Sequence, residues 1–119
     1  MKLLAVFIGG GLGSLCRYGI AKWIGPTSGG FPTATLVANV LSCLVLGATW
    51  LYVSKHTQLP EPWRLFIMVG FCGGFSTFST FSLETFQLMQ DGQWVGALLY
   101  VGASVFACLL IFWALVKSM

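Results

Sequence analysis

The chain has 119 residues, of which 57% are hydrophobic and only 8% are charged, and its mean hydropathy is +0.88. A soluble domain carries about 25% charged residues, so this composition excludes a water-soluble domain and indicates an integral membrane protein of one domain. The net charge of +3 is spread along the chain and forms no basic patch, which argues against a nucleic-acid-binding protein.

Four apolar stretches are each long enough to cross a bilayer, which takes about 20 residues in helical form. The predicted spans cover residues 3–23, 35–52, 63–89 and 94–116, joined by short connections at 25–30, 54–62 and 90–93. The first span contains Arg17, is interrupted by Gly9, Gly10, Gly11 and Gly13, and lacks a typical cleavage signal, so we interpret it as a retained helix rather than a signal peptide. The sequence therefore predicts an all-α fold of four transmembrane helices in a single domain, residues 1–119.

The basic residues are distributed unequally between the two predicted sides of the membrane. An even number of spans puts both termini on the same side as the loop around Lys55. That side holds Lys2, Lys55, Arg64 and Lys117, against Lys22 and Arg17 on the other. The positive-inside rule then favours cytoplasmic termini by a small margin.

Glycines are concentrated in the first and third spans, where they favour close packing of helices. Four helices enclose too little space both to hold a water-filled pathway and to shield it from lipid. We therefore expect an oligomer, most simply a homodimer. The four cysteines lie far apart in apolar segments without metal-ligand spacing, so free thiols are expected rather than disulfides or a metal site.

Polar side chains inside the predicted spans are candidates for function. Arg17 is either an arginine that reaches the interface or a charge that attracts anions at a vestibule. Asn39 lies well inside the second span, where its amide could join helices or offer N–H donors to a passing anion. Tyr100, Ser104 and Cys108 recur every four residues along the fourth span. This stripe is either helix-packing surface or a polar track.

Residues 70–84 of the third span, GFCGGFSTFSTFSLE, concentrate glycines, hydroxyls and phenylalanines. Gly73 and Gly74 each lower helix stability by roughly 1 kcal/mol relative to alanine. The hydroxyls of Ser76 and Thr77 could satisfy the backbone groups that a break would free. The pattern predicts a helix break near 73–77, which is tolerated at membrane depth only where it is buried or lines a cavity. Alternatively, the two glycines serve only close packing.

The second half of this stretch repeats phenylalanine every three residues, at Phe75, Phe78 and Phe81. In a helix these rings share one broad face, and hydroxyl side chains cover the rest. Glu84 follows Phe81 by three residues and lies on a nearby face. Its carboxylate could pair with a cation, complete a hydroxyl network or carry protons.

Three groups of residues carry a resemblance to a known family: Arg17-Tyr18 after a glycine-rich start, Thr35-x-x-x-Asn39 with Gly47 later, and the run from Gly70 to Glu84. They resemble the Fluc (CrcB) family of fluoride channels over essentially the whole chain. The resemblance implies an antiparallel, dual-topology homodimer in the cell inner membrane, with two pores and a broken third helix in each subunit. It implies a fluoride-selective channel that passively exports fluoride from the cytoplasm. No nucleophile–base pair, metal-ligand cluster or phosphate-binding loop suggests an enzyme.

The resemblance also assigns site residues. The implied fluoride pore consists of Asn39, Phe78, Ser79, Thr80, Phe81, Glu84, Tyr100 and Ser104. Arg17 would lie at the vestibule, and the backbone carbonyls of Gly73 and Ser76 would hold a structural sodium ion between the subunits. The chain departs from the family pattern in having Ser76 where threonine is usual and Cys108 where serine is usual. A thiol is a weak donor, so the far end of the polar track differs.

Two other functions are compatible with a small four-helix membrane protein. One is a proton-coupled drug antiporter, but such transporters carry an acidic residue in the first helix, and this span has none. The other is a non-transporting membrane assembly protein, in which the glycines and hydroxyls serve only packing. A fluoride flux measurement distinguishes both from a channel.

Overall fold

The computed structural model describes residues 1–26, 30–56 and 58–118; residues 27–29 and 57 of the first two predicted connections lie outside this part. The elements are α1 (Lys2–Ile24), α2 (Thr33–Lys55), α3 (Glu61–Arg64), the π-helix η2 (Leu65–Phe71), α4 (Cys72–Phe75), α5 (Phe78–Gln90) and α6 (Trp94–Lys117). In the described residues four helical segments are long and apolar enough to cross a membrane, the third being the run Glu61–Gln90. The prediction of an all-α protein with four membrane-length helices is confirmed.

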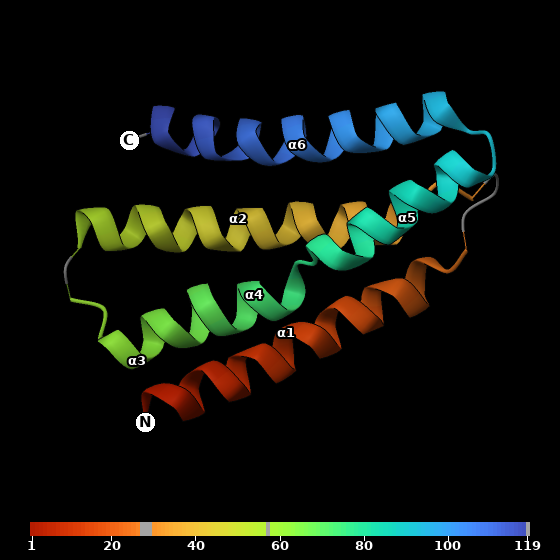
Figure 1. Ribbon diagram of the computed structural model, residues 1–119. Helices are drawn as coiled ribbons and strands as arrows, with labels where there is room; N and C mark the ends of the chain where they lie inside the picture. Colours follow the sequence, from red (N-terminus) through yellow and green to blue (C-terminus); the bar gives the residue numbers. More distant parts are fainter. Residues whose placement is uncertain (27–29, 57, 119) are drawn as a thin grey trace.

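The third segment changes its packing partner halfway along its length. Its first half, η2 and α4, packs on α1, whereas α5 packs on α6, and α2 lies along α6. Figure 1 shows α4 ending in the middle of the bundle and α5 continuing from it along a displaced path. Both termini lie at the same end of the bundle, together with the α2–α3 connection (Figure 1). The interruption between α4 and α5 therefore lies at the centre of the molecule, where all four segments meet.

Two residues separate α4 from α5, and both have extended backbone. Ser76 has φ −85° and ψ 159°, and Thr77 has φ −153° and ψ 122°. Thr77 then caps α5, because its Oγ1 accepts a hydrogen bond of 3.2 Å from the backbone N–H of Thr80. A threonine at this position suits both roles, since β-branched residues favour extended backbone and hydroxyls satisfy the first free N–H groups of a helix.

Glycines bring the backbone of α1 into direct contact with the third segment. A methyl group added to Gly13 would overlap the carbonyl oxygen of Phe71, and one added to Gly74 would overlap that of Gly10. This contact, the glycine seam, agrees with the predicted close packing. Gly11 and Gly73 take no part in it, because an added Cβ at either position would meet no atom within 4 Å.

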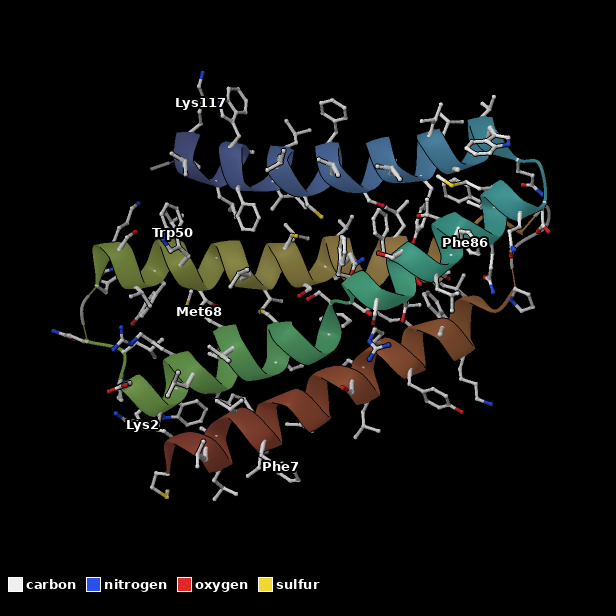
Figure 2. The ribbon with its side chains drawn as sticks, viewed as in Figure 1. Lys2, Phe7, Trp50, Met68, Phe86 and Lys117 are labelled. Atoms are coloured by element: carbon white, nitrogen blue, oxygen red, sulfur yellow. The ribbon has the colours of Figure 1, made fainter. Side chains whose placement is uncertain are left out.

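The outer surface of the chain is apolar, as a lipid-facing surface should be. Phe7 points away from the bundle (Figure 2), and Phe7 and Phe86 are both exposed. Lys2 and Lys117 lie at the same end of the molecule (Figure 2). There the Lys2 Nζ is 3.2 Å from a carboxylate oxygen of Glu61, and the Lys117 Nζ lies 4.9 Å from the centre of the Trp113 ring. Charged and aromatic side chains thus occupy the region where a membrane meets water.

Candidate functional site

Three helices contribute to an open groove beside the interruption, with a volume of about 300 Å³. Its lining comprises Asn39 and Cys43 of α2, Ser76, Thr77, Phe78 and Phe81 of the third segment, and Ser104, Val105 and Cys108 of α6. Four residues predicted for a fluoride pore, Asn39, Phe78, Phe81 and Ser104, are therefore brought together from distant parts of the sequence. We call this space the groove.

Asn39 binds the backbone of the interruption with both ends of its side-chain amide. Its Oδ1 accepts a hydrogen bond of 2.8 Å from the Thr77 N–H, and its Nδ2 donates one of 3.3 Å to the Thr77 carbonyl. The Thr77 N–H would otherwise be unpaired, because the extended backbone of Ser76 and Thr77 interrupts the helix before it, and the carbonyl at the N-cap of α5 gains an additional donor. The amide nitrogen carries two N–H donors, and the Thr77 carbonyl uses one of them. Asn39 thus fixes the interruption and retains a donor for a ligand in the groove.

Two carbonyl groups near the end of α4 are paired with side chains of other helices. The Cys72 carbonyl accepts hydrogen bonds from the hydroxyls of Ser42, at 3.0 Å, and Ser76, at 2.7 Å. The Gly74 carbonyl accepts one of 3.1 Å from the Nε of Arg17. Arg17 is therefore attached to the end of α4, which a purely interfacial arginine would not be.

Two other carbonyl groups lose the donors that a continuous helix would supply. In a continuous helix the Thr77 N–H would donate to the Gly73 carbonyl, but here it donates to the Asn39 side chain. Likewise, the Thr80 N–H would donate to the Ser76 carbonyl, but here it donates to the Thr77 hydroxyl. Gly73 is exposed, and no atom lies within 4 Å of the position its Cβ would take. The interruption therefore leaves the Gly73 and Ser76 carbonyls without their helical donors, at an exposed and a half-buried residue respectively.

A larger cavity of about 870 Å³ lies at the end of the bundle that holds the α1–α2 and α5–α6 connections. Arg17 of α1 and Thr80 and Glu84 of α5 contribute to its lining, together with Thr35 of α2. Thr80 and Glu84 are one helical turn apart and so face the same side of α5. Asp91 adds a second carboxylate to the lining. A wide space with one guanidinium and two carboxylates has the form of a vestibule.

Tyr100 lies between the groove and the cavity and is completely buried. Its hydroxyl donates a hydrogen bond of 3.1 Å to the Glu84 carboxylate, which lines the cavity. Its ring packs against Phe81 of the groove, with 4.9 Å between ring centres, and meets Phe31 edge-on at 5.6 Å. This one side chain thus connects the Glu84 carboxylate of the cavity with the Phe81 ring of the groove.

The hydroxyl of Ser104 is the one buried side-chain polar atom, among the described residues, that has no hydrogen-bond partner. The residue is only 7% exposed and lies in the groove lining. Leaving a buried hydroxyl unpaired costs free energy, about 1–3 kcal/mol, so such a group calls for an explanation. A ligand in the groove that accepts a hydrogen bond would supply the missing partner.

Ser79 differs from the other predicted pore residues. It is exposed, it does not belong to the lining of either space described above, and its hydroxyl lies 3.4 Å from that of Thr77. Sequence reasoning expected the Thr77 hydroxyl to satisfy a freed backbone group, as it does for the Thr80 N–H, but it missed two residues of the site, Phe31 and Ser42. Ser42 could have been found, because it follows Asn39 by three residues and shares its helix face. Phe31 gave no such signal, since it lies just before α2 in a connection.

Comparison with known proteins identifies similar sequences along nearly the whole chain. Residues 4–116 match the family described as CrcB-like protein, Camphor Resistance (CrcB). The chain is 47% identical over 111 residues to the fluoride-specific ion channel FluC of Paramagnetospirillum magneticum, covering 91% of this chain and 87% of that protein. It is 46% identical over 97 residues to FluC of Serratia proteamaculans, which covers 82% of this chain and 76% of that protein. It is 40% identical over 114 residues to FluC of Geobacter metallireducens, which covers 95% of this chain and 92% of that protein.

Proposed function

The chain belongs to the CrcB-like family, and from this premise we propose that it is a fluoride-selective channel that lets fluoride leave the cytoplasm. It is a multi-pass membrane protein with four membrane-length helices in its described part, and we place it in the cell inner membrane. The observation that best supports conduction through the groove is the buried, unpaired hydroxyl of Ser104. A drug antiporter or an assembly protein gives no reason for a buried donor to be left without a partner.

The groove offers what a small, strongly hydrated anion needs when it leaves water. A pore must replace the hydration shell with donors placed by the protein. The Ser104 hydroxyl and the second N–H of Asn39 are such donors. The rings of Phe78 and Phe81, whose centres are 5.9 Å apart, can add the positive partial charge of their edges. Neutral donors bind an anion weakly enough to release it, so flow would be passive.

A single chain leaves the groove incomplete, which supports a homodimer. Phe78 is 78% exposed, although it belongs to the groove lining together with the polar side chains of Asn39 and Ser104. Polar groups that face lipid are costly, and a second copy would cover them. We propose an antiparallel pair with dual topology. The small charge bias, four basic residues against two, is compatible with insertion in both directions.

The carbonyls of Gly73 and Ser76 fit a structural sodium ion. Both lack the donors that a continuous helix would supply, and hard carbonyl oxygens at the end of a helix suit Na⁺. One chain offers two such ligands, so two chains would provide four at their interface. In this proposal the ion holds the two subunits together, and the interruption of the third segment provides its binding site.

The proposed function is tested by anion efflux from liposomes that contain the purified, full-length protein. We expect fluoride to leave much faster than chloride, as measured with ion-selective electrodes. Protein that is folded and dimeric in detergent but releases neither ion would rule out the channel. Drug-dependent proton release would instead support the antiporter.

Replacing Ser104 by alanine should slow fluoride efflux without lowering the thermal stability. The hydroxyl makes no hydrogen bond within the chain, so its removal leaves no other group unpaired. The flux should fall about tenfold if one donor of about 1.5 kcal/mol is lost from the path. Ser118→Ala is the matched control, because the Ser118 hydroxyl bonds only to the Leu115 carbonyl at the exposed end of α6. Wild-type flux in Ser104→Ala would remove this hydroxyl from the pathway.

Replacing Phe78 or Phe81 by isoleucine should also slow fluoride efflux while the dimer remains folded. Isoleucine preserves an apolar side chain but lacks the positive ring edge that can face an anion. Efflux rates and size-exclusion profiles of both variants check this expectation, with Phe86→Ile as the control, because Phe86 is exposed and does not line the groove. Unchanged flux in both groove variants would contradict the role of the ring edges.

A further inference from the structure

We propose that Cys43 and Cys108 form a two-coordinate binding site for a soft, thiol-seeking cation such as Hg²⁺ in the wall of the groove. The two residues lie on different helices, α2 and α6, and both belong to the groove lining. Neither is part of a disulfide, and each is partly exposed, so both thiols are available to a ligand in that space.

The fold places the two thiols in one space. The Cys108 Sγ lies 3.9 Å from the Asn39 carbonyl oxygen. Cys43 follows Asn39 by one helical turn and therefore lies on the same face of α2. Cys43 and Cys108 both line the groove, so their side chains face the same space from opposite sides of the α2–α6 interface. Two free thiols that share one groove across a helix interface are placed to bind one metal ion between them.

The number and type of ligands determine which cation the pair can hold. Within the described part of the chain, no three histidine, cysteine, aspartate or glutamate side chains come together as a metal site. Zinc sites in proteins require about four ligands, so this pair is too small for zinc. Two thiolates suit soft ions that accept linear coordination, and sulfur selects such ions over the hard Na⁺ or Mg²⁺. The nearby Asn39 carbonyl is a hard oxygen and adds nothing for a soft ion.

Binding is an exchange of ligands without electron transfer. Each thiol releases its proton to water, and HgCl₂ releases its two chlorides as two S–Hg bonds form. The product is a neutral bridge between α2 and α6. Ser104 lies one helical turn before Cys108, so the bridge would stand in the groove beside the unpaired hydroxyl. Bound mercury should therefore obstruct the passage of fluoride, and this consequence rests on the proposed function.

Mercury retention tests the site without reference to flux. Full-length protein is loaded with HgCl₂, passed through a desalting column with excess monothiol, and analysed for mercury and protein by elemental analysis. The wild type and Cys16→Ser, which changes an exposed cysteine outside the groove, should each retain one mercury per chain. Cys43→Ser and Cys108→Ser should retain none, because a single thiolate loses the competition with the monothiol. Equal mercury retention in all four proteins would overturn the site. So would a variant Cys72→Ser that loses the mercury while Cys43→Ser and Cys108→Ser keep it.

Fluoride efflux from liposomes then tests whether the site lies in the conduction path. Each protein is compared with its own untreated rate. HgCl₂ should slow fluoride efflux through the wild type and Cys16→Ser at least about tenfold. It should slow efflux through Cys43→Ser and Cys108→Ser less than about twofold, because loss of one of two ligands weakens metal binding strongly. If the protein retains mercury but its fluoride efflux is unchanged, the mercury site does not lie in the conduction path. Absence of efflux in all untreated proteins would contradict the proposed function, and the retention assay would still decide the metal site.

Discussion

Replacing Asn39 by leucine is expected both to lower the thermal stability and to abolish fluoride efflux. The side-chain amide pairs the N–H and the carbonyl of Thr77, at 2.8 and 3.3 Å. Leucine has a similar size but leaves the Thr77 N–H without a partner, at a cost of about 1–3 kcal/mol, and removes a donor from the Thr77 carbonyl. The variant also removes the N–H donor that remains for an anion. Thermal unfolding in detergent and liposome efflux measure the two losses separately.

Asn39→Asp separates the structural role of this residue from its role in conduction. A carboxylate oxygen can still accept the Thr77 N–H, so stability should fall less than in Asn39→Leu. An ionised carboxylate about 4 Å from the anion would oppose it by about 4 kcal/mol at an effective dielectric constant of 20, which corresponds to roughly a thousandfold slower flux. Near-normal efflux in the aspartate variant would show that Asn39 only holds the interruption. Ser54→Ala, at the exposed end of α2, should leave both properties unchanged.

Gly13→Ala is expected to destabilise the protein strongly, because the glycine seam has no room for a methyl group. The added carbon would overlap the Phe71 carbonyl oxygen, and backbone atoms cannot turn aside as a flexible side chain can. The helices would have to separate, at a cost of about 1–3 kcal/mol or more. Because α1 also holds the end of α4 through Arg17 and the Gly74 carbonyl, the shift should reach the interruption and slow efflux.

Gly11→Ala is a control on the same helix, for which the expected change in stability has the opposite sign. An alanine Cβ at this position would meet no atom within 4 Å, so no contact is disturbed. Alanine favours helix by up to about 1 kcal/mol over glycine, and the melting temperature should stay the same or rise. Equal losses of stability in Gly13→Ala and Gly11→Ala would contradict the seam, because the two variants would then share a cause other than contact with the third segment.

The sequence alone determined the class of the protein and the approximate position of each span. Hydropathy and span length are local properties, and a bilayer allows few other arrangements of an apolar chain. Local chemistry also singled out residues 70–84, because glycines and hydroxyls are unfavourable inside a lipid-facing helix. The same reasoning selected Asn39 and Ser104 as polar side chains in apolar surroundings, without indicating which partner each would meet.

The tertiary structure alone decided those partners. Asn39 binds Thr77, Arg17 binds the Gly74 carbonyl and Tyr100 binds Glu84, across sequence separations of 38, 57 and 16 residues. The absence of a partner for the Ser104 hydroxyl and the meeting of Cys43 and Cys108 in one groove are likewise features of packed helices. No local pattern encodes these contacts, because the rotation and spacing of one helix against another depend on how all their side chains pack together.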